Sequence, residues 1–239
     1  MTGLALNLSS RIVGDAGVLY CKGKVVAGPE AAELLQQTKA LLVLCSDVVL
    51  NFSEITYVDS SGLGALVTLC SRAGVPNGQV VLCNLSQKIN DLLTLTKLRT
   101  LFEIYESESA AISALYGEVE RPSKPGAPSG PRLLCVDSSC ELLVYLREIL
   151  QAENYQVLTT LNLSDALLLL KATQFSLLLL GPNFVRAGSS AVEALRAAAG
   201  KVPALILQDH QDAAEMARDI LGQISKELTP KQSAASRPS

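Results

Sequence analysis

Residues 57–66, with the sequence YVDSSGLGAL, join a strongly apolar run to an amphipathic one. The apolar run before them, Asp47–Phe52, is typical of a strand that is buried on both faces. Asp59 and Ser60 belong to the residue types that cap helix N-termini. Apolar residues then recur at the spacing of a helical face, at Leu63, Leu66, Val67 and Cys70. The stretch therefore predicts a turn from a strand into a helix that begins at Asp59 or Ser60.

A serine at the N-terminus of a helix can carry a phosphate without unfolding that helix. Free backbone N–H groups and the positive end of the helix dipole both favour an anion there. On Ser60 a phosphate would add about −1.5 to −2 charges beside Asp59, which at an apolar interface means repulsion and desolvation. Phosphorylation is therefore expected to abolish docking of a partner and to leave the fold intact.

The simpler alternative is that Asp59 and Ser60 only cap the helix. Gly62 and Gly64 would then allow the helix to pack closely on the sheet. Residue physics alone favours this alternative, because capped helices are far commoner than phosphorylation switches.

The stretch lacks the patterns of common catalytic and nucleotide sites. Val58 stands where the nucleophile elbow G-x-S-x-G needs its first glycine. Val67 stands where a G-x-G-x-x-G dinucleotide finger needs its last. His210, the only histidine, lies in the other half of the chain, so no catalytic triad can be proposed. No catalytic residue, metal ligand or cofactor is assigned, and His210 is expected to be a solvated loop residue.

The remainder of the first half alternates strand and helix signals. Extended runs at residues 4–8 and 17–21, with a turn at 14–17, predict an edge hairpin. Further strands are expected at 47–52, 79–84 and 102–105, with a loop over 53–58. Helices are expected at 29–44, from 59 or 60, from 86, and at 107–116.

Composition limits the class of protein. A chain of 239 residues favours two domains, and 49% hydrophobic with 18% charged residues is a globular composition. The net charge of −3 comes without a basic run, so nucleic acid is not an expected partner. The N-terminus does not resemble a signal peptide, and Asp165 and Lys171 interrupt the Leu-rich stretch 161–180, so no membrane span is expected. The protein is expected in the cytoplasm.

The six cysteines lie in apolar segments without a C-x-x-C pair. They are expected to be reduced, buried thiols and not a disulfide framework or a zinc site. They are Cys21, Cys45, Cys70, Cys83, Cys135 and Cys140.

A Pro- and Gly-rich stretch, 118–131, reads as a solvated linker between two domains. Beyond it, strands are expected at 132–136, 155–159, 175–180 and 202–207, and helices from 138 or 139, at 164–172, at 189–199 and at about 212–228. Such alternation predicts βαβ units and a parallel sheet. The expected division is a domain at 1–117, the linker, a domain at 132–228 and a polar tail at 229–239.

Residues of about 4–116 resemble a STAS domain of the anti-sigma-factor antagonist type. The resemblance rests on Asp59–Gly64 after an apolar strand, on Cys21–Val25 and on the closing segment Leu98–Tyr105. It implies a mixed sheet with helices and a serine, here Ser60, that is phosphorylated by a partner anti-sigma factor with serine-kinase activity. The unphosphorylated form binds that partner and releases the sigma factor, a phosphatase restores it, and the antagonist itself catalyses nothing.

The same resemblance implies roles for the residues beside Ser60. Asp59 helps to orient the hydroxyl. Ser61, Gly62 and Leu63 join Asp59 in the surface that binds the partner.

Residues of about 132–228 resemble a response-regulator receiver domain, which has a flavodoxin-like parallel sheet. Asp137 stands in the position of an acid in the family's metal site, but Ser138 replaces the second acid, and Gly181 stands where the phosphoacceptor aspartate would be. Gln208 stands at the usual Thr/Ser switch position, and the strand with the Lys-Pro pair is missing, so the domain is expected to be truncated. Asp137 alone cannot build a magnesium site. The departures imply a pseudo-receiver that serves protein contact, with a homodimer as one form of it.

Together these features predict an α/β protein of two domains that acts as an anti-sigma-factor antagonist, with Ser60 as its switch. One alternative is a STAS scaffold that is never phosphorylated and works in a signalling assembly. Another is an enzyme or small-molecule-binding protein that uses the cleft at the strand ends.

Overall fold

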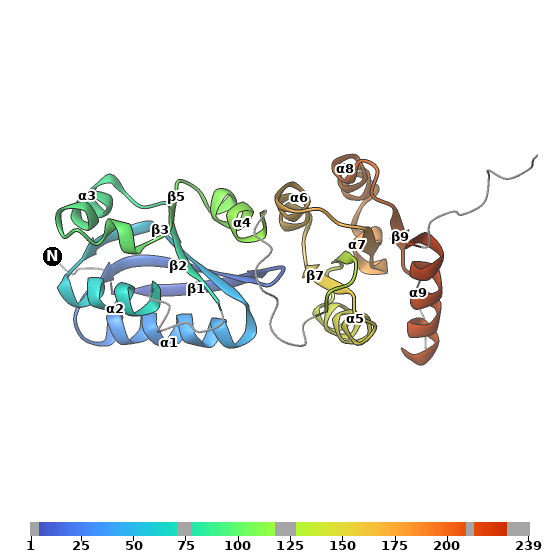
Figure 1. Cartoon of the computed structure of the whole chain (residues 1–239), viewed down its shortest axis with the longest axis horizontal. Helices are drawn as coiled ribbons and strands as arrows, with labels where there is room; N and C mark the ends of the chain where they lie inside the picture. Colours follow the sequence, from blue (N-terminus) through green and yellow to red (C-terminus); the bar gives the residue numbers. More distant parts are fainter. Residues whose placement is uncertain (1–4, 71–77, 118–127, 209–212, 229–239) are drawn as a thin grey trace, which may run out of the picture. The chain divides into compact units, whose positions relative to one another are not determined.

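The computed structural model describes residues 5–70, 78–117, 128–208 and 213–228. The chain divides into two compact units, residues 1–124 with 171–173, and residues 125–170 with 174–239. Each unit contains a sheet and helices (Figure 1), which confirms the predicted α/β class. Each is described by itself below.

The first unit is built on a five-stranded mixed sheet in the order β1-β2-β3-β4-β5. Strand β1 runs antiparallel to β2, and the other neighbours are parallel. The strands are β1 (Asn7–Val13), β2 (Ala16–Val25), β3 (Asp47–Val58), β4 (Val80–Cys83) and β5 (Ile104–Tyr105).

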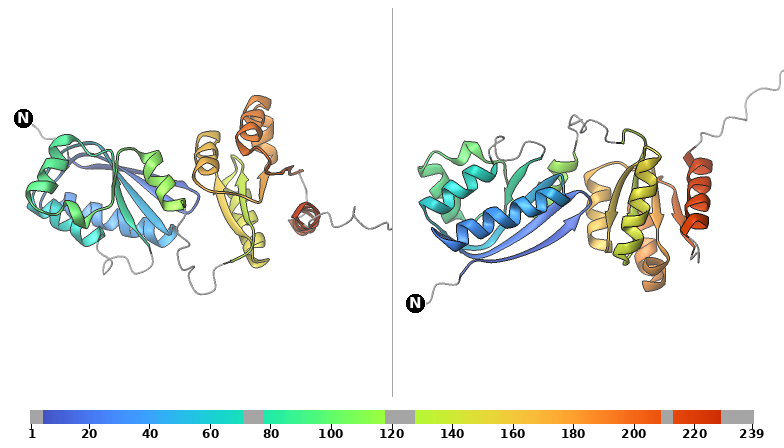
Figure 2. Two further views of the ribbon diagram at one scale, coloured as in Figure 1. Left: turned by 45° about the horizontal axis from the view of Figure 1, so that its top comes forward. Right: turned by 90° about the horizontal axis from the view of Figure 1, so that it is seen from below.

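Helices cover both faces of this sheet because the central strands are apolar on both sides. Val48, Leu50 and Phe52 of β3 belong to the core beneath α1 and α2, which lie side by side (Figure 2). Helix α4 packs on the opposite face, as Figure 1 shows. The helices are α1 (Pro29–Leu44), α2 (Ser60–Cys70), α3 (Gln87–Leu95), the short 3-10 helix η1 (Arg99–Leu101) and α4 (Glu108–Tyr116).

Two elements of the first unit differ from the prediction. The first hairpin strand, expected at 4–8, is displaced to Asn7–Val13, and the second, expected at 17–21, is longer and covers Ala16–Val25. The two strands pair from Asn7↔Lys22 to Val13↔Ala16. The expected loop at 53–58 is the second half of β3, since Glu54 to Val58 pair with the end of β2. This extension carries the chain to the edge of the sheet immediately before Asp59.

The second unit has a parallel four-stranded sheet in the order β7-β6-β8-β9. Numbered from its own first strand this order is 2-1-3-4, the start of the flavodoxin-like order 2-1-3-4-5. Residues 207–212, between β9 and the following helix, are too few for another crossover and strand, which agrees with the predicted truncation. The strands are β6 (Arg132–Val136), β7 (Gln156–Thr160), β8 (Leu177–Leu180) and β9 (Ala204–Ile206).

Side chains of β6 and β8 alternate between two helical layers. Leu133 and Leu177 share a core with α5 and α9, whereas Figure 1 shows α6 and α8 on the other face. The Gly-Pro segment after β8, expected to be a loop, forms the helix α7 because Pro182 suits the first helical position. The helices are α5 (Cys140–Ala152), α6 (Leu163–Ala172), α7 (Pro182–Ala187), α8 (Ser189–Ala199) and α9 (Ala213–Leu228).

The predicted linker and tail fall mostly outside the described part of the chain. This holds for residues 118–127, for the tail 229–239 and for His210. Residues 129–131 are described, and they are attached to the second unit: Ser129 N donates to Asn154 Oδ1 at 2.9 Å, and Gly130 N donates to the Asn154 carbonyl at 2.9 Å. The solvated linker therefore ends earlier than predicted.

All six cysteines are free thiols. The prediction that they are buried holds for Cys21, Cys45, Cys83 and Cys135, whereas Cys70 is partly buried and Cys140 is exposed. Burial raises the pKa of the Cys135 thiol to about 12, which keeps it protonated and unreactive. Within the described residues, no helix is both long and apolar enough to cross a membrane.

Candidate functional site

The predicted switch lies where β3 ends and α2 begins. Ser60 is the first residue of α2, and Ser60 and Ser61 are both exposed. The end of β3 pairs in parallel with the end of β2, so Val25 and the residues after it lie beside Asp59. The site is therefore at the carboxyl edge of a parallel sheet, where loops of α/β proteins commonly meet ligands and partners.

Asp59, and not Ser60, caps the helix. Asp59 Oδ1 accepts a hydrogen bond from Gly62 N at 2.8 Å, and Oδ2 accepts one from Ala27 N at 2.8 Å. The backbone N–H of Asp59 donates to the carbonyl of Val25 at 3.1 Å. One carboxylate thus ties the start of α2 to the loop after β2. The expectation of free N–H groups for a phosphate is wrong at Gly62, because Asp59 already occupies that donor.

The two glycines of the motif have different roles. A Cβ on Gly62 would overlap the carbonyl oxygen of Val25 and would lie 2.9 Å from Cγ1 of Val58. A Cβ on Gly64 would meet nothing within 4 Å. Close packing on the sheet therefore depends on Gly62 alone.

Gly62 and Leu63 are poor surface residues, contrary to their predicted part in partner binding. Both are buried, and Leu63 belongs to the core of the first unit. Asp59 is partly exposed, and Ser60 and Ser61 are exposed. Of the predicted site, the structure leaves Asp59, Ser60 and Ser61 on the surface.

The hydrogen bonds to Asp59 predict how it responds to acid. They lower the pKa of its carboxyl, with the largest effect from Gly62 and the next from Ala27. Because the folded-state pKa lies below the unfolded value of about 3.9, the carboxylate's contribution to stability is fully present above that value. It is lost as the pH falls through the lowered folded-state pKa.

We therefore expect the difference in free energy of unfolding between wild type and Asp59→Asn to be constant near neutral pH and to shrink below about pH 4. Urea titrations at a series of pH values measure it. Ser60→Ala, which removes no titratable group, is the control, and its difference from wild type should not change with pH. A difference for Asp59→Asn that grows in acid would contradict the assignment.

Two residues that were not predicted as site residues contact each other at the end of β3. Tyr57 is 45% exposed and pairs with Lys24 of β2. Lys88, in the first turn of α3, places Nζ 5.9 Å from the centre of the Tyr57 ring. Tyr57 was expected in a loop, and no pattern in the sequence connects it with Lys88.

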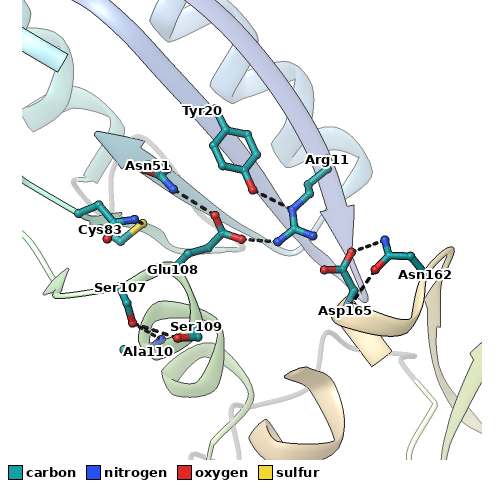
Figure 3. Close-up of polar contacts among 11 residues, drawn as sticks. Arg11, Tyr20, Asn51, Cys83, Ser107, Glu108, Ser109, Ala110, Asn162 and Asp165 are labelled. Atoms are coloured by element: carbon teal, nitrogen blue, oxygen red, sulfur yellow. Dashed lines mark hydrogen bonds and ion pairs between the residues drawn. The ribbon is translucent and has the colours of Figure 1, made fainter. Parts of the chain in front are cut away.

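A second polar cluster, also absent from the prediction, holds α4 on the sheet (Figure 3). Glu108, the first residue of α4, forms an ion pair with Arg11 of β1 and accepts a hydrogen bond from Asn51 Nδ2 at 3.0 Å. Arg11 Nε donates to the Tyr20 hydroxyl at 2.9 Å. Burial, and then the neighbouring Glu108, raise the pKa of Tyr20. The cluster spans three strands and fixes the N-terminus of α4.

In the second unit, the structure brings Asp137 and Gly181 together. Asp137 is fully buried. Its carboxylate accepts hydrogen bonds from Ser139 N at 2.7 Å, Asn183 N at 2.9 Å, Asn183 Nδ2 at 3.0 Å and Phe184 N at 3.1 Å. A Cβ on Gly181 would overlap Oδ2 of Asp137 and lie 2.6 Å from its Cγ. The acid therefore occupies the space that a side chain at position 181 would need.

The other two positions predicted in the second unit are on the surface. Ser138 and Gln208 are exposed, and the cap of α5 is Ser139, whose hydroxyl oxygen accepts from Leu142 N at 3.3 Å. Across the residues that the structure describes, no three His, Cys, Asp or Glu side chains are grouped to hold a metal ion. Both carboxylate oxygens of Asp137 accept hydrogen bonds from N–H donors, so its role is to hold the segments after β6 and β8 in place.

The first unit is similar to several known proteins. Residues 8–111 match the model of the STAS domain family. An anti-sigma F factor antagonist from Paenibacillus polymyxa is 27% identical over 71 residues, which are 30% of this chain and 61% of that protein. A STAS-domain containing protein from Pseudomonas aeruginosa is 38% identical over 56 residues, which are 23% of this chain and 55% of that protein. The similar stretches thus span less than two thirds of either relative.

Among solved structures, the chain is similar to the anti-sigma factor antagonist SpoIIAA in its unphosphorylated form. The two are 18% identical with a TM-score of 0.40, over 48% of this chain and 100% of that one.

Proposed function

We propose that the first unit binds an anti-sigma factor with serine-kinase activity and that phosphorylation of Ser60 by this partner ends the interaction. Before phosphorylation, the protein acts as an anti-sigma-factor antagonist. A phosphatase restores this unphosphorylated form. The observation that carries the proposal is the exposed hydroxyl of Ser60 at the first position of a helix that Asp59 already caps. A kinase can reach this hydroxyl without unfolding any element.

The position of Asp59 also supports the direction of the switch. Its carboxylate accepts the hydrogen bond from Gly62 N, so that donor is already occupied, and a phosphate on the exposed Ser60 would face solvent or a partner. The phosphate would add about −1.5 to −2 charges beside an existing anion. We expect this to weaken binding at least about tenfold, which corresponds to about 1.4 kcal/mol. The match to the STAS family and the similarity to a protein named as an anti-sigma F factor antagonist agree with this proposal.

We infer for the second unit a receiver-like module that makes protein contacts and takes no phosphate. The support is the buried Asp137 carboxylate, which has four N–H donors and fills the space beside Gly181. In this proposal all covalent regulation lies in the first unit.

One experiment tests both units. The full chain is incubated with candidate serine-kinase anti-sigma factors, ATP and Mg²⁺, and then with acetyl phosphate and Mg²⁺, and phosphate is measured by intact mass and peptide mapping. Wild type should gain one phosphate, on Ser60, from a kinase. Ser60→Ala should gain none, and Ser61→Ala, the neighbouring exposed hydroxyl, should still be modified.

Four outcomes would contradict parts of the proposal. A phosphate that persists in Ser60→Ala would contradict the site. No phosphate with any kinase would favour a STAS scaffold that is never phosphorylated, and a cofactor bound to the purified protein would favour the small-molecule alternative. A labile acyl phosphate within residues 125–239 would contradict the assignment of the second unit.

A further inference from the structure

Tyr57 is an exposed aromatic residue near the end of β3. Its neighbours Ile55 and Val58 are each 3% exposed, whereas Tyr57 is 45% exposed. The register of β3 on β2 shifts by one residue between Ile55 and Tyr57, so that Tyr57 pairs with Lys24 and no longer faces the side on which Ile55 is buried. Tyrosine is among the residues that most often dominate the energy of protein interfaces. Tyr57 lies three residues before Ser60, at the end of β3, and both residues are exposed, so one partner surface could contact both.

Lys88 places a positive charge next to the Tyr57 ring, although the first turn of a helix disfavours cations. Lys88 is in the first turn of α3, whose cap is Ser86. The helix dipole favours anions in the first turn and opposes cations there. The stability of α3 therefore does not account for Lys88, whereas its contact with the Tyr57 ring at 5.9 Å places it on the surface beside the switch.

Charges around Tyr57 favour an acidic partner. Lys24 is the cross-strand neighbour of Tyr57, and Lys88 lies over its ring. Glu54 is paired with Lys22 at 2.6 Å. The hydrogen bonds that Asp59 and Asp91 accept do not remove their charges, so the preference for an acidic partner rests on the two lysines at the ring itself.

We propose that Lys24, Tyr57 and Lys88 form the contact that selects the partner at Ser60, and that the partner presents an acidic segment with an apolar side chain against the Tyr57 ring. This rests on the proposed function. It also explains why phosphorylation would weaken binding. A phosphate on Ser60 would be attracted to the two lysines and would repel the partner's carboxylates. An acidic segment is therefore bound before modification and rejected afterwards.

The test is steady-state phosphorylation of the full chain by a serine kinase that modifies wild type at Ser60. Lys88→Glu and Tyr57→Ala are each expected to raise KM for the chain about tenfold or more, with kcat nearly unchanged. Rising salt should raise KM for wild type more steeply than for Lys88→Glu, because the variant has lost a charge contact. Far-UV circular dichroism checks that both variants are folded.

Two matched variants control for charge and for loss of an exposed side chain. Lys39→Glu makes the same charge change on the exposed side of α1, and Leu95→Ala removes an 82% exposed side chain at the other end of α3. Both should behave as wild type. Suppose that wild type is phosphorylated but KM is unchanged in Lys88→Glu and Tyr57→Ala, or changes equally in the controls. The proposed contact is then wrong, and the proposed function is unaffected. If no kinase modifies wild type, the proposed function and this inference both fail.

Discussion

Gly62→Ala is expected to destabilise the first unit by roughly 1–3 kcal/mol, toward the upper end of the usual cost of overpacking. The added methyl group would overlap the Val25 carbonyl oxygen, which is backbone and cannot rotate away, and would crowd Val58. The helix must shift outward, and Asp59 would lose its hydrogen bond to Gly62 N. Hydrogen exchange of the full chain measures the effect and resolves it by unit, which matters because two units need not unfold together.

Gly64→Ala is the matched control in the same helix. A methyl group there meets nothing within 4 Å. Alanine is the better helix former, so this change is expected to stabilise the unit by roughly 0.5–1 kcal/mol. Effects of opposite sign at these two glycines, which are separated by one residue, would support the close approach at Gly62. Destabilisation of similar size at both would contradict it.

The sequence was sufficient for the start of α2 and for the order of the elements other than η1 and α7, because period and cap chemistry are local. It could not choose between Asp59 and Ser60 as the cap, since both are good cap types and only the path of β3 decides. That path was missed because residues 53–58 are polar enough to be taken for a loop. Their strand conformation depends on pairing with β2, a contact that is distant in the chain.

The site was predictable to the same extent. The exposed hydroxyls of Ser60 and Ser61 were expected, but no local signal separates a buried Gly62 from an open Gly64. The cluster of Arg11 and Glu108 joins residues 97 positions apart, so it appears only once the sheet is formed. Contacts of this kind are set by tertiary packing, which a single sequence does not reveal.

The second unit illustrates how a substitution is absorbed. The sequence analysis identified Asp137 as the one acid that resembles a metal-site residue, and Gly181 as a departure at the expected phosphoacceptor position. It did not predict that Asp137 would turn into the space beside Gly181, because the segment after β8 was taken for a loop. As the helix α7, that segment supplies the backbone N–H groups of Asn183 and Phe184 to the carboxylate.

Asp137→Ala is expected to be among the most destabilising single changes in the second unit, at roughly 3–5 kcal/mol. Hydrogen bonds to a charged group contribute about 1.5–3 kcal/mol each, and their loss leaves buried N–H groups of α7 without a partner. Gly181→Ala should cost roughly 1–3 kcal/mol, because its methyl group would overlap the carboxylate. Hydrogen exchange in residues 128–208 measures both, and Asp137→Asn, which keeps the side-chain volume, is the milder variant if Asp137→Ala does not fold.

The double variant Asp137→Ala/Gly181→Ala decides whether the two positions share one space. With the carboxylate gone, a methyl group at position 181 fills part of the cavity, so the double change should cost less than the sum of the single changes by about 1–2 kcal/mol. Additive costs would mean that the two side chains do not compete. A favourable coupling would mean that the Asp137 carboxylate and a side chain at position 181 compete for one space, so a larger side chain at position 181 should be tolerated only when Asp137 is removed.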